Sequence, residues 1–186
     1  SGGVVTTALF SGNAYVTALF QGMTASAVVT VNPLVNPGFE EDATGWSVGS
    51  ASAIVTEDKY AGSKSLRLTS QASFGNSKKV NIPIQPQTNY KLSFFAKSGG
   101  GFRVYARNDA AAVELSNSRV QTTNNTNPTW QAYTSGTFNS GVYTNITIYL
   151  SDTTAAVAGS KHYIDEIQLI EVPAAVPQVS SIAFEE

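Results

Sequence analysis

The chain has no cysteine and only one histidine, His162, among its 186 residues. The lack of cysteine excludes disulfides, thiolate zinc sites and cysteine nucleophiles. A single histidine with no obvious nucleophile partner is also a poor basis for a Ser-His-Asp triad or a catalytic zinc centre. No glycine motif for a phosphate loop or a dinucleotide is present. We therefore expect a module that is not itself an enzyme.

Charged residues are also scarce. They make up 13% of the chain, and the net charge is -2, whereas an ordinary soluble protein has about 25% charged residues. The longest basic run is Lys78-Lys79, which argues against a nucleic-acid partner. No run of about 18 apolar residues occurs, so we expect no membrane insertion. This balance is typical of bacterial modules that are extracellular or on the cell surface. A start at Ser1 without a signal peptide suggests a processed fragment.

Helical periodicity is almost absent, and alternation of apolar and polar residues takes its place. Turn residues separate the alternating runs, which are Ser65–Thr69, Lys79–Ile84, Tyr90–Ala96, Phe102–Ala106, Trp130–Phe138, Asn145–Leu150 and Tyr163–Ile170. Many short strands at near-regular spacing predict an all-β sandwich or barrel.

The alternation also predicts which side chains face the core, since successive residues of a strand point to opposite faces. We expect these inward sets: Leu66 and Leu68; Val80, Ile82 and Ile84; Tyr90, Leu92, Phe94 and Ala96; Phe102, Val104 and Ala106. Pro83 predicts an edge strand or the end of a ladder, because proline cannot donate to a sheet.

The central region carries five landmarks in order: LVNPGFEEDATGW at 34–46, YAGSKSLRL at 60–68, TNYKLSFFAKSG at 88–99, WQAYTSGTF at 130–138 and YIDEIQLIE at 163–171. It resembles the carbohydrate-binding modules of the family 4, 9, 16 and 22 group. The resemblance implies a jelly-roll β-sandwich of two antiparallel sheets. It also implies a non-catalytic module that binds a polysaccharide or oligosaccharide for a larger protein, such as a glycoside hydrolase.

In similar modules the strands alternate between two sheets. One sheet would hold SLRL, YKLSFFA, WQAYTSGTF and YIDEIQL, and the other KKVNIP, FRVYAR, the 113–122 region and NITIYL. The second sheet is concave in such modules, and its outward face carries the ligand. Period 2 places on that face Lys79, Asn81, Arg103, Tyr105, Arg107, Asn145, Thr147 and Tyr149.

This set suits a sugar. We expect Tyr105 and Tyr149 to stack on a pyranose ring, and Arg103, Arg107, Asn81 and Gln121 to bind its hydroxyls. The two arginines also allow an acidic sugar. A site in the loops, anchored by Trp46 or Phe74, is the alternative. A further alternative is an ordinary solvent-exposed sheet surface that binds no ligand, since tyrosine is common in strands.

In similar modules a structural calcium ion ties the first strand to the last. The matching positions are Glu40 and Asp165, with backbone oxygens from the turn around Gly62–Lys64, so that Lys64 would contribute a carbonyl. Carboxylates and carbonyls are the ligands that Ca²⁺ prefers. Solvated loop charges are the alternative interpretation.

The two ends resemble other repeats. Residues 1–31 contain GNAYVTALFQGMTASAVVTV and resemble the last two strands of a bacterial Ig-like domain of the Big2 type. We expect the jelly roll at 32–172. A linker and the first strand of a following repeat would occupy 173–186. This arrangement predicts neighbouring domains in the same chain. A structural or adhesive spacer without sugar binding is the alternative function, and a receptor-binding domain is a third.

Overall fold

A computed structural model describes residues 12–20, 23–71, 76–123, 126–153 and 157–173. Its strands are β1 (Gly12–Phe20), β2 (Met23–Val31), β3 (Ser52–Val55), β4 (Ser65–Thr69), β5 (Asn76–Pro83), β6 (Asn89–Gly99), β7 (Phe102–Asn108), β8 (Val113–Glu114), β9 (Val120–Gln121), β10 (Thr126–Thr134), β11 (Phe138–Asn139), β12 (Asn145–Asp152) and β13 (Lys161–Glu171). These residues contain no helix long and apolar enough to cross a membrane.

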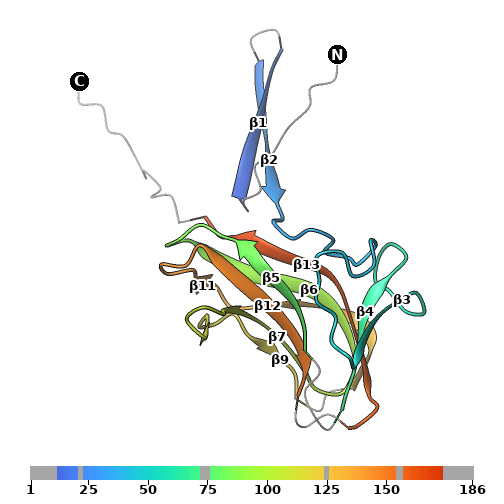
Figure 1. The fold of residues 1–186 in the computed structure, drawn as a ribbon. Coiled ribbons are helices and arrows are strands. Elements are labelled where there is room, and N and C mark those ends of the chain that lie inside the picture. Colours follow the sequence, from blue (N-terminus) through green and yellow to red (C-terminus); the bar gives the residue numbers. More distant parts are fainter. Residues whose placement is uncertain (1–11, 21–22, 72–75, 124–125, 154–156, 174–186) are drawn as a thin grey trace, which may run out of the picture.

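The central strands form two antiparallel sheets packed face to face (Figure 1). One has the order β10-β6-β13-β4-β3, with β11 also paired to β6, and the other has the order β5-β12-β7-β8, with β9 also paired to β7. The fold is the predicted jelly-roll sandwich, and the assignment of strands to the two sheets is confirmed. The expected strand 130–138 is divided between β10 and β11, because Ser135 bonds to Leu92 through both its backbone N–H and its hydroxyl.

The core lies between the two sheets and follows the predicted alternation in β4, β6 and β7. In β6 the exposure alternates residue by residue along the whole strand. Leu66, Tyr90, Leu92, Ala96 and Phe102 are completely buried. Burying a large apolar side chain contributes about 1.5–3 kcal/mol, so this face drives the association of the sheets.

Strand β5 departs from its predicted phase. Ile82 and Ile84 face the core as expected, but Val80 is 42% exposed and Lys79 is 7% exposed. The cause is a β-bulge: Ile82 pairs with Ile146 and Lys79 with Ile148, so two residues of β5 lie opposite Thr147 alone. Asn81, with φ 53°, takes the left-handed conformation in this bulge. An extra residue in a strand reverses the sheet face to which each preceding side chain of that strand points. The prediction that Val80 faces inward and Lys79 outward is therefore wrong.

A second bulge bends β13. Asp165 pairs with Phe95 and Gln168 with Ser93, which leaves one extra residue in β13, and Glu166 has φ 52°. Next to this bulge, the carbonyl of Pro37 accepts a hydrogen bond from the N–H of Ile167. The segment before Trp46 is thereby fastened to the last strand.

At the amino-terminal end, β1 and β2 form a two-stranded antiparallel hairpin that projects from the sandwich (Figure 1). Just after it, the amide of Asn32 bonds to the carbonyl of Ile167 and accepts from the N–H of Leu169. Asn32 is therefore attached directly to the last strand of the sandwich. The expected strand in VSSIAFEE and most of the linker lie outside the described residues.

Candidate glycan-binding face and cation site

Tyr105 and Tyr149 lie directly opposite each other on β7 and β12. Their rings are parallel within 8°, with centroids 5.2 Å apart. Offset stacking of this kind stabilises an aromatic pair by about 0.5–1.5 kcal/mol. The sequence placed both residues on one face, and the antiparallel register then makes them neighbours.

Four cations cover this pair. Arg103 and Arg119 lie over the ring of Tyr105, at 5.6 and 5.4 Å from its centroid, and Lys78 and Arg107 lie over Tyr149, at 5.6 and 5.9 Å. As a result each tyrosine is only 9% exposed. We call these six residues the tyrosine–arginine face. Its tyrosines are therefore less accessible than an open stacking surface would require, and its chemistry is dominated by guanidinium and ammonium groups.

Two carboxylates, those of Asp109 and Glu114, contact residues of the tyrosine–arginine face. Asp109 accepts hydrogen bonds from the hydroxyls of Thr147 and Tyr149, both at 2.8 Å. Burial acts to raise the pKa of Asp109, but these hydrogen bonds and the charges of Arg107 and Lys78 outweigh burial and lower it. Glu114 forms an ion pair with Arg119. Four cations against two carboxylates leave a net charge of +2 here, in a chain of net charge -2.

Of the other expected sugar contacts, Gln121 lies on β9 opposite Arg103 and accepts a hydrogen bond from Arg119 at 3.3 Å. Asn81 is exposed, in the bulge of β5. Trp46 does not join this face. It is 6% exposed within the core, its ring lies 5.0 Å from that of Phe39, and its indole N–H donates to the carbonyl of Asn36. Phe74 lies outside the described residues.

Sequence reasoning missed Lys78, Arg119 and Asp109. Lys78 lies opposite Tyr149 in the sheet because of the bulge at Asn81, which period 2 does not locate. Arg119 comes from the turn between β8 and β9, and Asp109 follows β7, where period 2 no longer applies. Only the residue types of Arg119 and Asp109 could have indicated a role, since arginine and aspartate are common in polar binding sites.

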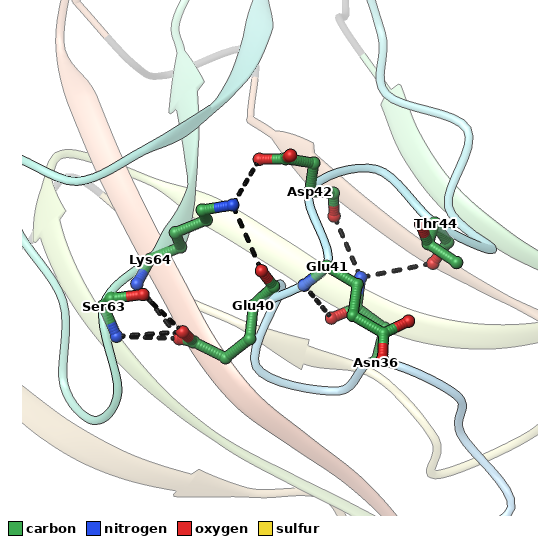
Figure 2. A network of polar contacts seen from close by, with 7 residues as sticks. All are labelled: Asn36, Glu40, Glu41, Asp42, Thr44, Ser63 and Lys64. Carbon is green, nitrogen blue, oxygen red and sulfur yellow. Dashed lines mark hydrogen bonds and ion pairs between the residues drawn. The ribbon is translucent and has the colours of Figure 1, made fainter.

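Glu40, Lys64 and Asp165 meet at one turn, residues 60–64. The Glu40 carboxylate accepts from the N–H and hydroxyl of Ser63, at 2.9 and 2.6 Å, and from the N–H of Lys64 (Figure 2). These bonds, those of Ser63 first, lower the pKa of Glu40. The Lys64 ammonium contacts Asp42 at 2.6 Å and the carbonyl of Glu40 at 3.1 Å.

Asp165 lies on the other side of the same turn and is completely buried. It accepts from the N–H groups of Tyr60, Ala61 and Glu166, at 3.0, 3.2 and 2.9 Å. Burial raises its pKa to about 6 despite these bonds. Within the described ranges no three Asp, Glu, His or Cys side chains gather as a metal group. Carboxylate oxygens are ligands that Ca²⁺ prefers, and here those of Glu40 and Asp165 accept hydrogen bonds from N–H and hydroxyl groups, chiefly those of the 60–64 turn.

Residues 31–156 match the model of a family described as a carbohydrate binding domain. The chain belongs to this family. It is thus a carbohydrate-binding module, and the domain itself is non-catalytic. The buried His162 fits this conclusion, since its two ring nitrogens contact the hydroxyls of Ser70 and Ser98 and the residue is not exposed.

Solved structures with the same fold include a family 61 module in complex with beta-1,4-galactotriose. It is 21% identical, with a TM-score of 0.57, over 76% of this chain and 99% of that one. The xylan-binding CBM22-1 domain of Paenibacillus barcinonensis Xyn10C is 20% identical, with a TM-score of 0.54, over 74% and 93%. A cyclase from Fischerella sp. TAU is 15% identical, with a TM-score of 0.59, over 78% and 98%. No curated protein matches the chain.

Proposed function

We propose that the tyrosine–arginine face binds a polysaccharide and prefers an acidic one, such as a polyuronate. The supporting observation is the ring of four cations around the stacked tyrosines. Guanidinium groups match carboxylates in a planar, bidentate geometry. Because the cations lie over the rings, an acidic chain would draw them outward and uncover the tyrosines for its C–H faces.

The test is affinity electrophoresis against polygalacturonate and neutral xylan at two salt concentrations. We expect stronger retardation by polygalacturonate. Added salt should weaken it, because ions screen the attraction between exposed charges, with a Debye length of about 8 Å at physiological ionic strength. Arg107→Gln and Tyr149→Ala should each weaken binding about tenfold. Retardation that is equal for both polymers and unaffected by salt would contradict the acidic preference.

The alternative is a spacer module that binds no sugar through this face. The Tyr105–Tyr149 pair favours it to the extent that cross-strand aromatic pairs also stabilise sheets without any ligand. A folded protein retarded by neither polymer would select the spacer.

We also propose that Ca²⁺ binds at the 60–64 turn, held by Glu40, Asp165 and the Lys64 carbonyl. A bound ion would fasten the opening segment to β13 and stabilise the fold by mass action. We expect EDTA to lower the midpoint of thermal unfolding and CaCl₂ to restore it. Glu40→Gln should reduce this response, whereas Glu41→Gln, a neighbour whose side chain takes no part in the proposed set, should keep it. A midpoint of thermal unfolding that is unchanged by EDTA would contradict this calcium site.

The setting we propose is an extracellular or cell-surface bacterial protein, with Ig-like repeats of the Big2 type on both sides of the module. The projecting β1–β2 hairpin is compatible with the end of such a repeat. In that arrangement the module would raise the local concentration of its neighbours near the polysaccharide.

A further inference from the structure

The outer face of the other sheet carries a second group of aromatic side chains. Phe95 and Lys97 alternate with the core residues of β6 and so point away from the core. Tyr60, from the turn before β4, lies flat on Phe95, with ring centroids 3.6 Å apart and planes within 9°. Trp130, in a bulge of β10, stands beside Tyr60 at 6.1 Å and 59°. We call these three aromatics the Tyr60 cluster.

Polar bonds hold this cluster in place. The indole N–H of Trp130 donates to Asp58 at 3.0 Å, and the other oxygen of Asp58 pairs with Lys97. The backbone N–H of Tyr60 donates to the buried carboxylate of Asp165. The ring of Tyr60 is thus fixed by stacking below and by its backbone bond, so little side-chain entropy remains to be lost when a ligand binds.

The outer surface of Tyr60 is accessible. Tyr60 is 47% exposed, and among the residues after Val31 whose burial the structure describes it is the only aromatic in the exposed class. Tyr105 and Tyr149, by contrast, are covered by cations. A flat, fixed and exposed ring with a tilted indole beside it forms a corner with two apolar walls. The C–H face of a pyranose fits such a corner, with its hydroxyls toward Asp58 and Lys97.

The charge of this surface separates it from the first site. Asp58 and Lys97 neutralise each other, and Glu57 beside them pairs with Arg67. A polyuronate gains nothing from this balance, whereas an uncharged sugar meets paired acceptors and donors. From these contacts we infer that the Tyr60 cluster is a second glycan site, specific for a neutral pyranose unit. The module then binds glycan on both outer faces of the sandwich and can link two chains.

The test uses the two indole N–H signals in a nitrogen-edited NMR spectrum, since the chain has two tryptophans. Trp130→Phe assigns the signal of Trp130. Titration with neutral cello-, xylo- and galacto-oligosaccharides should shift the Trp130 signal in a saturable way and leave that of the buried Trp46 in place. Tyr60→Leu, which keeps apolar cover over Phe95 without a flat ring, should weaken binding about tenfold.

Matched controls separate this site from the tyrosine–arginine face and from misfolding. Tyr60→Phe keeps the ring and should keep the affinity, and Tyr105→Ala should leave the Trp130 titration unchanged. Thermal unfolding of each variant shows that it folds, and Tyr60→Ala provides a second truncation. No shift of Trp130 with any of the three sugars, or equal affinity in Tyr60→Leu, would overturn the inference whatever the other face binds.

Discussion

At the scale of single residues, this protein places titratable groups inside the sandwich with specific partners. His162 is fully buried between the hydroxyls of Ser70 and Ser98. Lys79 is nearly buried, bonds to the carbonyl of Val35 and lies over Trp46, and burial lowers its pKa. Such groups cost desolvation energy, which their hydrogen bonds offset.

His162 gives a direct test of this burial. Burial lowers the pKa of His162 below 6.5, although Asp152 acts in the opposite direction. Between the folded-state pKa and pH 6.5, His162 is therefore mostly protonated in the unfolded chain and mostly neutral in the folded chain. We expect this residue's contribution to stability to be present above pH 6.5 and lost as the pH falls through the folded-state pKa. An NMR titration of the imidazole measures the pKa, and a value of 6.5 or above would contradict the prediction.

At the scale of elements, β-bulges determine which side chains the strands direct to each face of the sheets. The bulge in β5 turns Lys78 toward Tyr149, and the bulge in β13 leaves Asp165 beside the 60–64 turn. Each inserts one residue and alters the local twist, which is how a sheet redirects a side chain. The proposed functional groups therefore depend on irregularities of otherwise regular strands.

Asn81 tests the bulge of β5. A β-branched residue is strained at its φ of 53°, whereas glycine accepts that value freely. We expect Asn81→Val to lower the free energy of unfolding by about 1–2 kcal/mol. Asn81→Gly should change it by a few tenths. Urea denaturation measures both, and equal stabilities of the two variants would show that the bulge is not needed.

At the scale of the whole molecule, the sandwich is continuous from Asn32 to β13, and its core lies between the two sheets. Asn32 connects the opening segment to the last strand through two hydrogen bonds. The hairpin before it pairs within itself (Figure 1). We therefore predict that the central module folds without the hairpin, although β1 also contacts β13.

Removal of residues 1–31 tests this unit. We expect the shortened chain to unfold cooperatively at nearly the same temperature as the full chain and to keep its glycan binding, because the hairpin contributes no residue to either proposed face. Asn32→Ala in the full chain should cost about 1–3 kcal/mol, since the backbone groups of Ile167 and Leu169 lose their partner. A shortened chain that fails to fold would place the hairpin within the folding unit.

The alternation of apolar and polar residues predicted the fold class and most of the core, and the family resemblance implied the two sheets. Burial alternates along the whole of β6, and period 2 placed Tyr105 of β7 and Tyr149 of β12 on one outward face. The other features depend on tertiary contacts. The facing of Lys78 and Lys79 depends on a bulge that period 2 cannot locate, and Arg119 reaches Tyr105 from a turn. The Tyr60 cluster joins residues 60, 95 and 130, which lie far apart in the chain. Their contacts depend on the register of β6 with β10 and on the position of the turn that carries Tyr60, and both are set by the packing of the whole sandwich.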